Sequence, residues 1–310
     1  MKAAIVSGPG QMPRLGDHPE PVAGPGEVLV RVTASAISHI TRGHAEGRHY
    51  SAGNRFPFIA GLDGTGRLPD GRRVWFALPR PPFGSLAELA PVPQALCIDL
   101  PDDLDDATAA ALAIPAMSSW LALAERAVLR PGETVLIQGA TGTSGRLAVQ
   151  IARHLGAGRV IATGRNPAAL QEVAALGADA VLTLDDEAGL RAELARGVNV
   201  VLDYLWGKPA ETLLIAAAKA GREAPLRYVH IGSVAGEAIA LPGAVLRAAP
   251  ITLMGSGTGS VPLPRLIAVV DALFRAARPA GLKIAFTPVP FVAFDTAWAQ
   301  EIPARTVFVL

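Results

Sequence analysis

The stretch that decides the fold covers residues 134–166 and reads TVLIQGATGTSGRLAVQIARHLGAGRVIATGRN. It contains a short apolar run, a glycine loop, a segment with helical spacing and a second apolar run. The contiguous apolar residues at 135–137 are typical of a strand that is buried on both faces. The order of strand, glycine loop, helix and strand predicts a unit that binds a dinucleotide at the start of the helix.

The glycine loop fits a pyrophosphate-binding site. Gly142 would let the backbone approach the pyrophosphate, and Gly145 would let the helix pack against the first strand. Backbone amides at the helix start would point at the anion, which the helix dipole also favours. The loop residues predicted to contact the cofactor are Ala140, Thr141, Gly142, Thr143, Ser144 and Gly145. Ala140 departs from the pattern G-x-G-x-x-G, so an ordinary glycine turn is the alternative, and the flanking elements favour the nucleotide site.

The end of the second apolar run selects the form of the cofactor. A site for NAD usually has Asp or Glu there, which accepts hydrogen bonds from the ribose hydroxyls. This chain has Gly164, Arg165 and Asn166 instead. Arg165 would bind a 2′-phosphate through charge-assisted hydrogen bonds, so we expect NADPH. The alternative is that Arg165 is a solvated surface cation, which leaves the missing acid unexplained.

The composition limits the class of protein. The sequence has 310 residues, of which 50% are hydrophobic and 18% charged, as in a globular chain large enough for two domains. The formal net charge of +1 gives no basic field for a nucleic acid. The lone Cys97 excludes an internal disulfide and a cysteine-rich zinc lobe. We identify no apolar run of membrane-spanning length and no signal peptide, so we expect a cytoplasmic protein without a membrane partner.

Residues 1–117 are predicted to form a β-rich domain. Frequent glycine and proline separate short apolar runs, which favours a small barrel or sandwich. The strands are expected at 2–6, 28–32, 71–76 and 85–90. A polar segment with several histidines covers 38–54. Two helices are expected at 107–114 and 117–128, with Asp102 or Asp105 as the N-cap.

Strands and helices alternate through residues 118–257. Helices are expected at 167–176, 188–196, 209–220 and 242–248, and strands at 180–184, 198–204, 226–232 and 251–254. This alternation predicts an α/β fold with a doubly wound parallel sheet. Ligands bind at the carboxyl ends of such strands, which adds Asp203, Gly232 and Ser233 to the predicted cofactor site. Ordinary loop turns are the alternative for these three residues.

The motifs outside the opening stretch are PGEVLVRV at 25–32, GLDGTG at 61–66, GRRV at 71–74, IPAMSSW at 114–120 and LGADAV at 176–181. With these motifs nearly the whole chain resembles the medium-chain dehydrogenase/reductase superfamily, and within it the zinc-independent quinone oxidoreductase branch. The resemblance implies a GroES-like barrel at 1–117, a Rossmann domain at 118–257 and a segment at 258–310. We expect this last segment, with a helix at 263–277 and strands at 286–292 and 306–310, to rejoin the barrel.

Departures from the superfamily's zinc enzymes indicate that no metal is bound. The zinc enzymes have a cysteine ligand where this chain has Ser38, and His-Glu where it has Leu62-Asp63. Leucine cannot bind zinc, and a neutral serine is a poor ligand beside a thiolate. We therefore expect neither a catalytic nor a structural zinc site.

The resemblance then implies hydride transfer from NADPH to a small molecule, either a quinone or an α,β-unsaturated carbonyl compound. A donor must neutralise the anion that forms on such an acceptor. His39, Thr41 and Tyr50 are the candidates, with His39 first because its charge changes near neutral pH. The alternative is that these residues belong to a polar surface loop.

Two further functions remain open. One is a non-catalytic NADPH-binding protein, a redox sensor or structural protein built on the same fold. The other is a zinc-free enzyme that acts on thioesters. The resemblance also implies a homodimer that forms at the edge strand 251–254, since edge strands readily pair with another chain.

Overall fold

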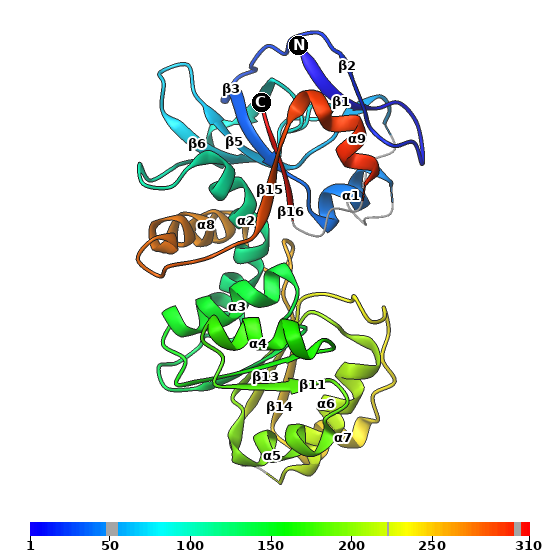
Figure 1. Cartoon of the computed structure of the whole chain (residues 1–310), viewed down its shortest axis with the longest axis vertical. Coiled ribbons are helices and arrows are strands. Elements are labelled where there is room, and N and C mark those ends of the chain that lie inside the picture. The colour runs from blue at the N-terminus through cyan, green and yellow to red at the C-terminus, as the bar shows by residue number, and fades with distance from the viewer. Residues whose placement is uncertain (48–54, 222, 301–304) are drawn as a thin grey trace. The chain divides into compact units, whose positions relative to one another are not determined.

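The computed structural model describes residues 1–47, 55–221, 223–300 and 305–310. The chain divides into two compact units, which we describe separately (Figure 1). The parallel-sheet unit comprises Pro115–Val269 and Pro279–Lys283. The β-rich unit comprises Met1–Ile114, Val270–Arg278 and Ile284–Leu310.

Six parallel strands form the sheet of the parallel-sheet unit. Their order across the sheet is β11 (Ala180–Thr183), β10 (Arg159–Gly164), β9 (Thr134–Gln138), β12 (Val200–Asp203), β13 (Leu226–His230) and β14 (Ile251–Gly255). In chain order the first strand of this sheet is β9, in the middle. Strands β10 and β11 then extend one half of the sheet, and β12, β13 and β14 extend the other half. This order confirms the predicted doubly wound α/β sheet, whose direction switches between β9 and β12.

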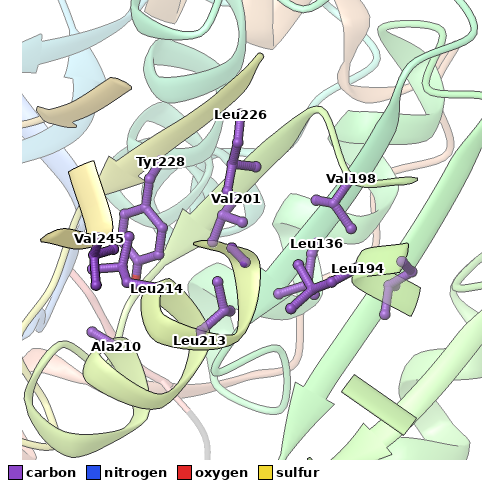
Figure 2. Close-up of a cluster of buried hydrophobic side chains, with 12 residues drawn as sticks. Leu136, Leu194, Val198, Val201, Ala210, Leu213, Leu214, Leu226, Tyr228 and Val245 are labelled. Carbon is purple, nitrogen blue, oxygen red and sulfur yellow. The ribbon is translucent and has the colours of Figure 1, made fainter. Parts of the chain in front are cut away.

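Helices cover both faces of this sheet. On one face lie α3 (Thr143–His154) and α4 (Pro167–Ala175), and on the other lie α5 (Glu187–Gly197), α6 (Gly207–Lys219) and α7 (Gly243–Ala248) (Figure 1). Figure 2 shows the core beneath α6, where Leu213 and Leu214 pack with Leu136, Val201 and Tyr228 of three neighbouring strands. All five side chains are fully buried. Burial of these side chains holds α6 against the strands whose carboxyl ends carry the predicted cofactor residues.

The β-rich unit is organised around β3 (Glu27–Ala36). Its larger sheet has the order β15 (Phe286–Pro290), β16 (Arg305–Val309), β3, β5 (Asp63–Arg67), β6 (Arg73–Ala77) and β8 (Cys97–Asp99), and β7 (Leu89–Pro93) also pairs with β3. A smaller sheet contains β2 (Arg14–Asp17), β1 (Lys2–Val6) and β4 (Phe58–Ile59). The C-terminal strand returns to this unit, because Val307 of β16 pairs with Ala36 of β3. The helix α8 (Leu263–Ala277) has the bounds expected from the sequence.

One long helix replaces the two that the sequence predicts at 107–114 and 117–128. Helix α2 (Asp106–Leu121) runs through Pro115 and continues as a π-helical turn (Ala122–Arg126). A proline inside a helix removes one backbone donor and bends the helix without necessarily ending it. The hydroxyls of Ser118 and Ser119 both donate to the carbonyl of Pro115, at 2.8 and 3.3 Å. The expected N-cap at Asp105 is present, since its Oδ1 accepts from the amide of Thr108 at 2.9 Å.

Other elements of the β-rich unit differ from the predictions. The strand expected at 85–90 begins later and forms β7. Before β7, the carbonyl of Leu86 accepts from the amide of Ala4 and the amide of Leu86 donates to the carbonyl of Ala60, so Leu86 does not extend the strand. Two short helices, α1 (His39–Ala45) and α9 (Phe294–Ala299), were not predicted. Each has too few turns to show a clear apolar period.

The prediction that no apolar run reaches membrane-spanning length is wrong for one segment. Residues Asp106–Arg126 form a helix that is long and apolar enough by length and composition, and 72% of its apolar window is buried inside the protein. Such burial is typical of the core helix of a globular protein.

Candidate cofactor and substrate sites

The loop after β9 has the close packing that its glycines predict. Gly139 has a φ of +87°, a conformation that side chains rarely adopt. The amide of Ala140 donates to the carbonyl of Thr163 at 2.8 Å, which ties the loop to β10. A Cβ on Gly145 would clash with the carbonyl oxygen of Gly139 and would lie 2.6 Å from the Cα of Ala140. Only glycine fits there, so the start of α3 lies directly against the end of β9.

The start of α3 offers backbone donors to a ligand. The N-cap is Gly142, which has extended backbone and no side chain to accept from the first turn. Thr143 is exposed and Ser144 is half-buried. In the part of the chain that the structure describes, no side chain caps this helix. Free first-turn amides and the helix dipole together bind anions, so the geometry fits the pyrophosphate that the sequence predicts.

Arg146 braces this loop, and sequence reasoning missed it. Its Nε donates to the carbonyl of Thr141 at 3.0 Å, while its Nη2 forms an ion pair with Glu172 at 2.7 Å. The guanidinium thus links the loop to α4. In the sequence Arg146 is a cation in the first turn of the predicted helix. Many surface helices carry such a residue, so its position alone did not single it out.

At the end of β10 the three predicted residues play different parts. A Cβ on Gly164 would lie 2.6 Å from the Cγ2 of Thr141, so glycine leaves room for that side chain. Arg165 is exposed and makes no ion pair or hydrogen bond with any described residue. The side chain of Asn166 caps α4 by accepting from the amides of Ala168 and Ala169, at 2.9 and 3.2 Å. Arg165 is therefore the group free to bind a phosphate.

Asp203, at the end of β12, is completely buried. Its Oδ1 accepts from the side-chain amide of Gln138 at 3.2 Å and from the backbone amide of Leu205 at 2.8 Å. Its Oδ2 accepts from the hydroxyl of Tyr228 at 2.7 Å and from the amide of Trp206 at 3.1 Å. The carboxylate is fully occupied inside the fold, where it holds the start of the loop that follows β12, so its direct contact with a cofactor is not what these hydrogen bonds favour.

Gly232 and Ser233 follow β13 on the same rim. The amides of Ile231 and Gly232 donate to the carbonyl of Asp203 at 2.8 and 3.2 Å, which continues the sheet beyond its last strand residues. Ser233 is exposed, and Val234 beside it donates to the carbonyl of Tyr204 at 3.4 Å. The parallel register thus brings the ends of β9, β10, β12 and β13 to one edge, as the sequence predicts.

A buried hydroxyl pair connects this rim to α3. The Oγ of Ser119 lies 2.8 Å from the hydroxyl of Tyr204 and donates to the carbonyl of Ser144 at 3.2 Å. Burial raises the pKa of Tyr204 to about 12, so the phenol stays neutral. Sequence reasoning missed this link because no local pattern relates residues so far apart.

Two of the predicted catalytic residues, His39 and Thr41, lie in the β-rich unit. Ser38 caps α1: its Oγ accepts from the amide of Thr41 at 3.0 Å and lies 2.8 Å from the Oγ1 of Thr41. Thr41 is buried, and its hydroxyl is already hydrogen-bonded to Ser38. His39 is exposed on the first turn of α1. Tyr50 lies outside the described residues. Within the described ranges no three of His, Cys, Asp and Glu group together as metal ligands.

Comparison with known proteins supports this reading of the two units. Residues 145–274 match a family model described as zinc-binding dehydrogenase. That match lies away from Ser38 and Leu62, the positions at which the zinc enzymes bind their metal. A protein of Emericella nidulans described as a probable NADPH-dependent quinone reductase is 33% identical, and the alignment covers 97% of each chain.

Solved structures and longer proteins are also similar. The quinone oxidoreductase from Thermus thermophilus, whose complex with NADPH is solved, is 29% identical with a TM-score of 0.84 over 100% of both chains. A mycocerosic acid synthase-like polyketide synthase of Mycobacterium tuberculosis is 32% identical over 67% of this chain, which spans 10% of that protein. The near-complete match to the Emericella nidulans protein is the decisive one. This chain belongs to the medium-chain dehydrogenase/reductase superfamily, in its quinone oxidoreductase-like family.

Proposed function

We propose that this chain is an NADPH-dependent, metal-independent oxidoreductase that transfers hydride to a quinone or an α,β-unsaturated carbonyl compound. The observation that carries the proposal is the combination, on one rim of a Rossmann sheet, of an uncapped helix start and an exposed Arg165 that has no partner among the described residues. Backbone amides at the start of α3 would hold the pyrophosphate, and Arg165 would hold the 2′-phosphate. The nicotinamide, when bound, supplies the hydride.

Two named relatives support the choice of cofactor and acceptor. The Emericella nidulans protein is described as an NADPH-dependent quinone reductase, and the Thermus thermophilus enzyme as a quinone oxidoreductase that binds NADPH. Both match the chain over 97% or more of its length. These descriptions favour turnover over the alternative of a non-catalytic redox sensor.

A second class of acceptor has separate support. Several relatives are polyketide synthases, including the NorB protein of the Streptomyces orinoci spectinabilin system, which is 32% identical over 73% of this chain. The chain spans 10% of NorB, so the whole protein's activity does not transfer. The likeness supports an unsaturated thioester as the second candidate acceptor.

One assay separates these functions. The purified protein is mixed with NADPH and a panel of quinones, unsaturated ketones and unsaturated thioesters, and the nicotinamide absorbance is followed. We expect oxidation of NADPH with at least one quinone or unsaturated ketone, and little with NADH. Turnover with thioesters alone would favour the second class. Tight binding of NADPH without oxidation by any acceptor would favour the sensor.

The proposal includes a cytoplasmic homodimer. Strand β14 is an edge of its sheet and pairs with β13 on one side, while its residues Ile251, Leu253 and Met254 are half-buried. Unpaired backbone on such an edge is available to the same strand of a second copy. Light scattering tests this: we expect the wild type to be a dimer and the Leu253→Pro variant to be a monomer. Fractionation of cells tests the location.

A further inference from the structure

Arg146 is tied, through Thr141, to the end of β10, where the 2′-phosphate is proposed to bind. Its Nε donates to the carbonyl of Thr141 at 3.0 Å. The Cγ2 of Thr141 lies 2.6 Å from the position that a Cβ on Gly164 would occupy, so the side chain of Thr141 packs against the residue before Arg165. Thr141 therefore contacts both the guanidinium of Arg146 and the backbone that leads into Arg165.

A glutamate of α4 completes this arrangement. The Oε2 of Glu172 lies 2.7 Å from the Nη2 of Arg146. The side chain of Glu172 is 66% exposed and has no other bond among the described residues, whereas that of Arg146 is 29% exposed. Glu193 in the same unit is different, because its side chain is 12% exposed and pairs with both Arg159 and Arg196. Glu172 is therefore held only by Arg146, and its carboxylate can move into water at little cost.

The two bonds of Arg146 use different nitrogen atoms. Its Nε donates to the backbone of the glycine loop and its Nη2 to Glu172. The first bond holds the guanidinium beside the loop whether or not the second is made. An arginine that keeps its position while it exchanges one anion for another suits phosphate binding, because its planar group can donate to two acceptors at once.

The start of α4 does not offer backbone donors to a phosphate. Asn166 follows Arg165 directly, and its side chain accepts from the amides of Ala168 and Ala169 at 2.9 and 3.2 Å. A phosphate at the end of β10 would thus depend on side-chain cations, which Arg165 and Arg146 supply.

We propose that Arg146 is a second specificity-determining arginine for the 2′-phosphate, and that Glu172 competes with this phosphate for its guanidinium. This inference rests on the proposed function. When NADPH binds, the Nη2 of Arg146 exchanges the carboxylate of Glu172 for an oxygen of the 2′-phosphate, which then bonds to both Arg146 and Arg165. NADH has a neutral hydroxyl at that position and leaves the ion pair intact.

The relative strengths of the two bonds favour this exchange. An ion pair with an exposed carboxylate shifts an equilibrium by roughly fivefold at most. A charge-assisted bond from arginine to phosphate contributes roughly tenfold or more, and the phosphate carries about two negative charges against one on Glu172. Arg146 therefore adds affinity for NADPH, and Glu172 reduces that gain without abolishing it.

Two nucleotides that differ only in the 2′-phosphate test the assignment: adenosine 2′,5′-bisphosphate and adenosine 5′-monophosphate. Calorimetric titration gives the ratio of their affinities for the wild type and for each variant. Arg146→Met should lower this ratio roughly tenfold, and Arg146→Lys, which keeps a charge without the planar group, should lower it less. Glu172→Gln should raise the affinity for the bisphosphate roughly two- to fivefold and leave that for the monophosphate unchanged, because it removes the competing carboxylate.

The matched control is Glu187→Gln. The side chain of Glu187 is 63% exposed and pairs with Arg191 at 3.0 Å, so this variant alters a similarly exposed ion pair in the same unit. It should change neither affinity. An equal gain for the bisphosphate in Glu187→Gln and Glu172→Gln would overturn the inference, since it would report only the change in net charge.

The outcomes separate this inference from the function on which it rests. If the wild type prefers the bisphosphate and the Arg146 and Glu172 variants keep its ratio, the inference fails and the proposed function stands. If Arg146→Met weakens both nucleotides equally, Arg146 only braces the loop, and the inference also fails. If the wild type binds neither NADPH nor the bisphosphate, the proposed function itself fails.

A crystal structure of the unaltered protein with NADPH covers the case in which the variants do not fold. We expect the Nη2 of Arg146 within hydrogen-bonding distance of a 2′-phosphate oxygen, and the carboxylate of Glu172 turned to solvent. An Arg146 that still pairs with Glu172 and does not contact the bound phosphate would overturn the inference.

Discussion

The Cα of Ala140 lies 2.6 Å from the position that a Cβ on Gly145 would occupy, so the helix α3 and the strand β9 meet with no space between them. Gly142, three residues earlier, is different. A Cβ there would have the carbonyl oxygen of Gly139 as its nearest neighbour at 3.7 Å, which is ordinary contact. The two glycines of the loop therefore differ: packing requires Gly145, whereas Gly142 has room for a side chain and lies at the helix start proposed to hold the pyrophosphate.

Alanine at each position separates these roles. Gly145→Ala should destabilise the protein by roughly 1–3 kcal/mol through overpacking, and weaken NADPH binding as the loop moves. Gly142→Ala should leave the melting temperature nearly unchanged, yet weaken NADPH binding roughly tenfold or more, because the added methyl group would lie where the proposed pyrophosphate approaches the backbone. Thermal unfolding and calorimetric titration measure both effects. Full NADPH affinity in Gly142→Ala would argue against a phosphate at this helix start.

Arg165→Glu tests the choice of cofactor. A charge-assisted hydrogen bond contributes roughly 1.5–3 kcal/mol, so we expect NADPH to bind about 10- to 100-fold more weakly while NADH is little affected. Calorimetric titration with both nucleotides gives the two affinities. The control is Arg191→Glu, which alters an exposed arginine already paired with Glu187 at 3.0 Å. Equal losses for NADPH and NADH in Arg165→Glu would mean that Arg165 does not contact the 2′-phosphate.

The sequence predicted the parts of the site that depend on local pattern. The strand, loop and helix around Gly142 and Gly145 have the expected order and packing, because each glycine has a local steric reason. The backbone of one short segment determines these contacts. The absence of an acidic residue after β10 could likewise be read from the sequence, because it depends only on which residues occupy one short segment.

Contacts between distant residues could not be predicted in this way. Asn166 was expected to bind cofactor, and its side-chain oxygen caps α4. Ser119 and Tyr204 are 85 positions apart, and only the folded sheet brings their hydroxyls together. Asp63 was noted as a departure from a zinc ligand set, and Arg305, whose charge acts on its pKa, comes near it only when β5 and β16 both pair with β3.

Asp203→Ala should be the most destabilising change at the rim of the parallel sheet. It leaves the hydroxyl of Tyr228, the side-chain amide of Gln138 and two loop amides without an acceptor, which predicts a loss of roughly 3 kcal/mol or more. Asp203→Asn keeps one oxygen and should cost less than half as much. Urea unfolding of both variants and of Tyr228→Phe gives the comparison. A stable Asp203→Ala protein with normal NADPH affinity would contradict the role of Asp203 in shaping the loop.

The burial of Asp63 predicts a specific dependence of stability on pH. Its pKa is about 6 in the fold and 3.8 as the ordinary value, so between these values the folded protein binds more protons than the unfolded chain. The free energy of unfolding should therefore fall as the pH rises through this window, by roughly 3 kcal/mol in total. Carboxyls whose pKa is lowered, such as those of Asp179 and Glu133, give the opposite slope, so the informative quantity is the difference between the wild type and Asp63→Asn. Urea unfolding across the window measures this difference, and parallel curves for the two proteins would show that Asp63 titrates in the fold as it does in water.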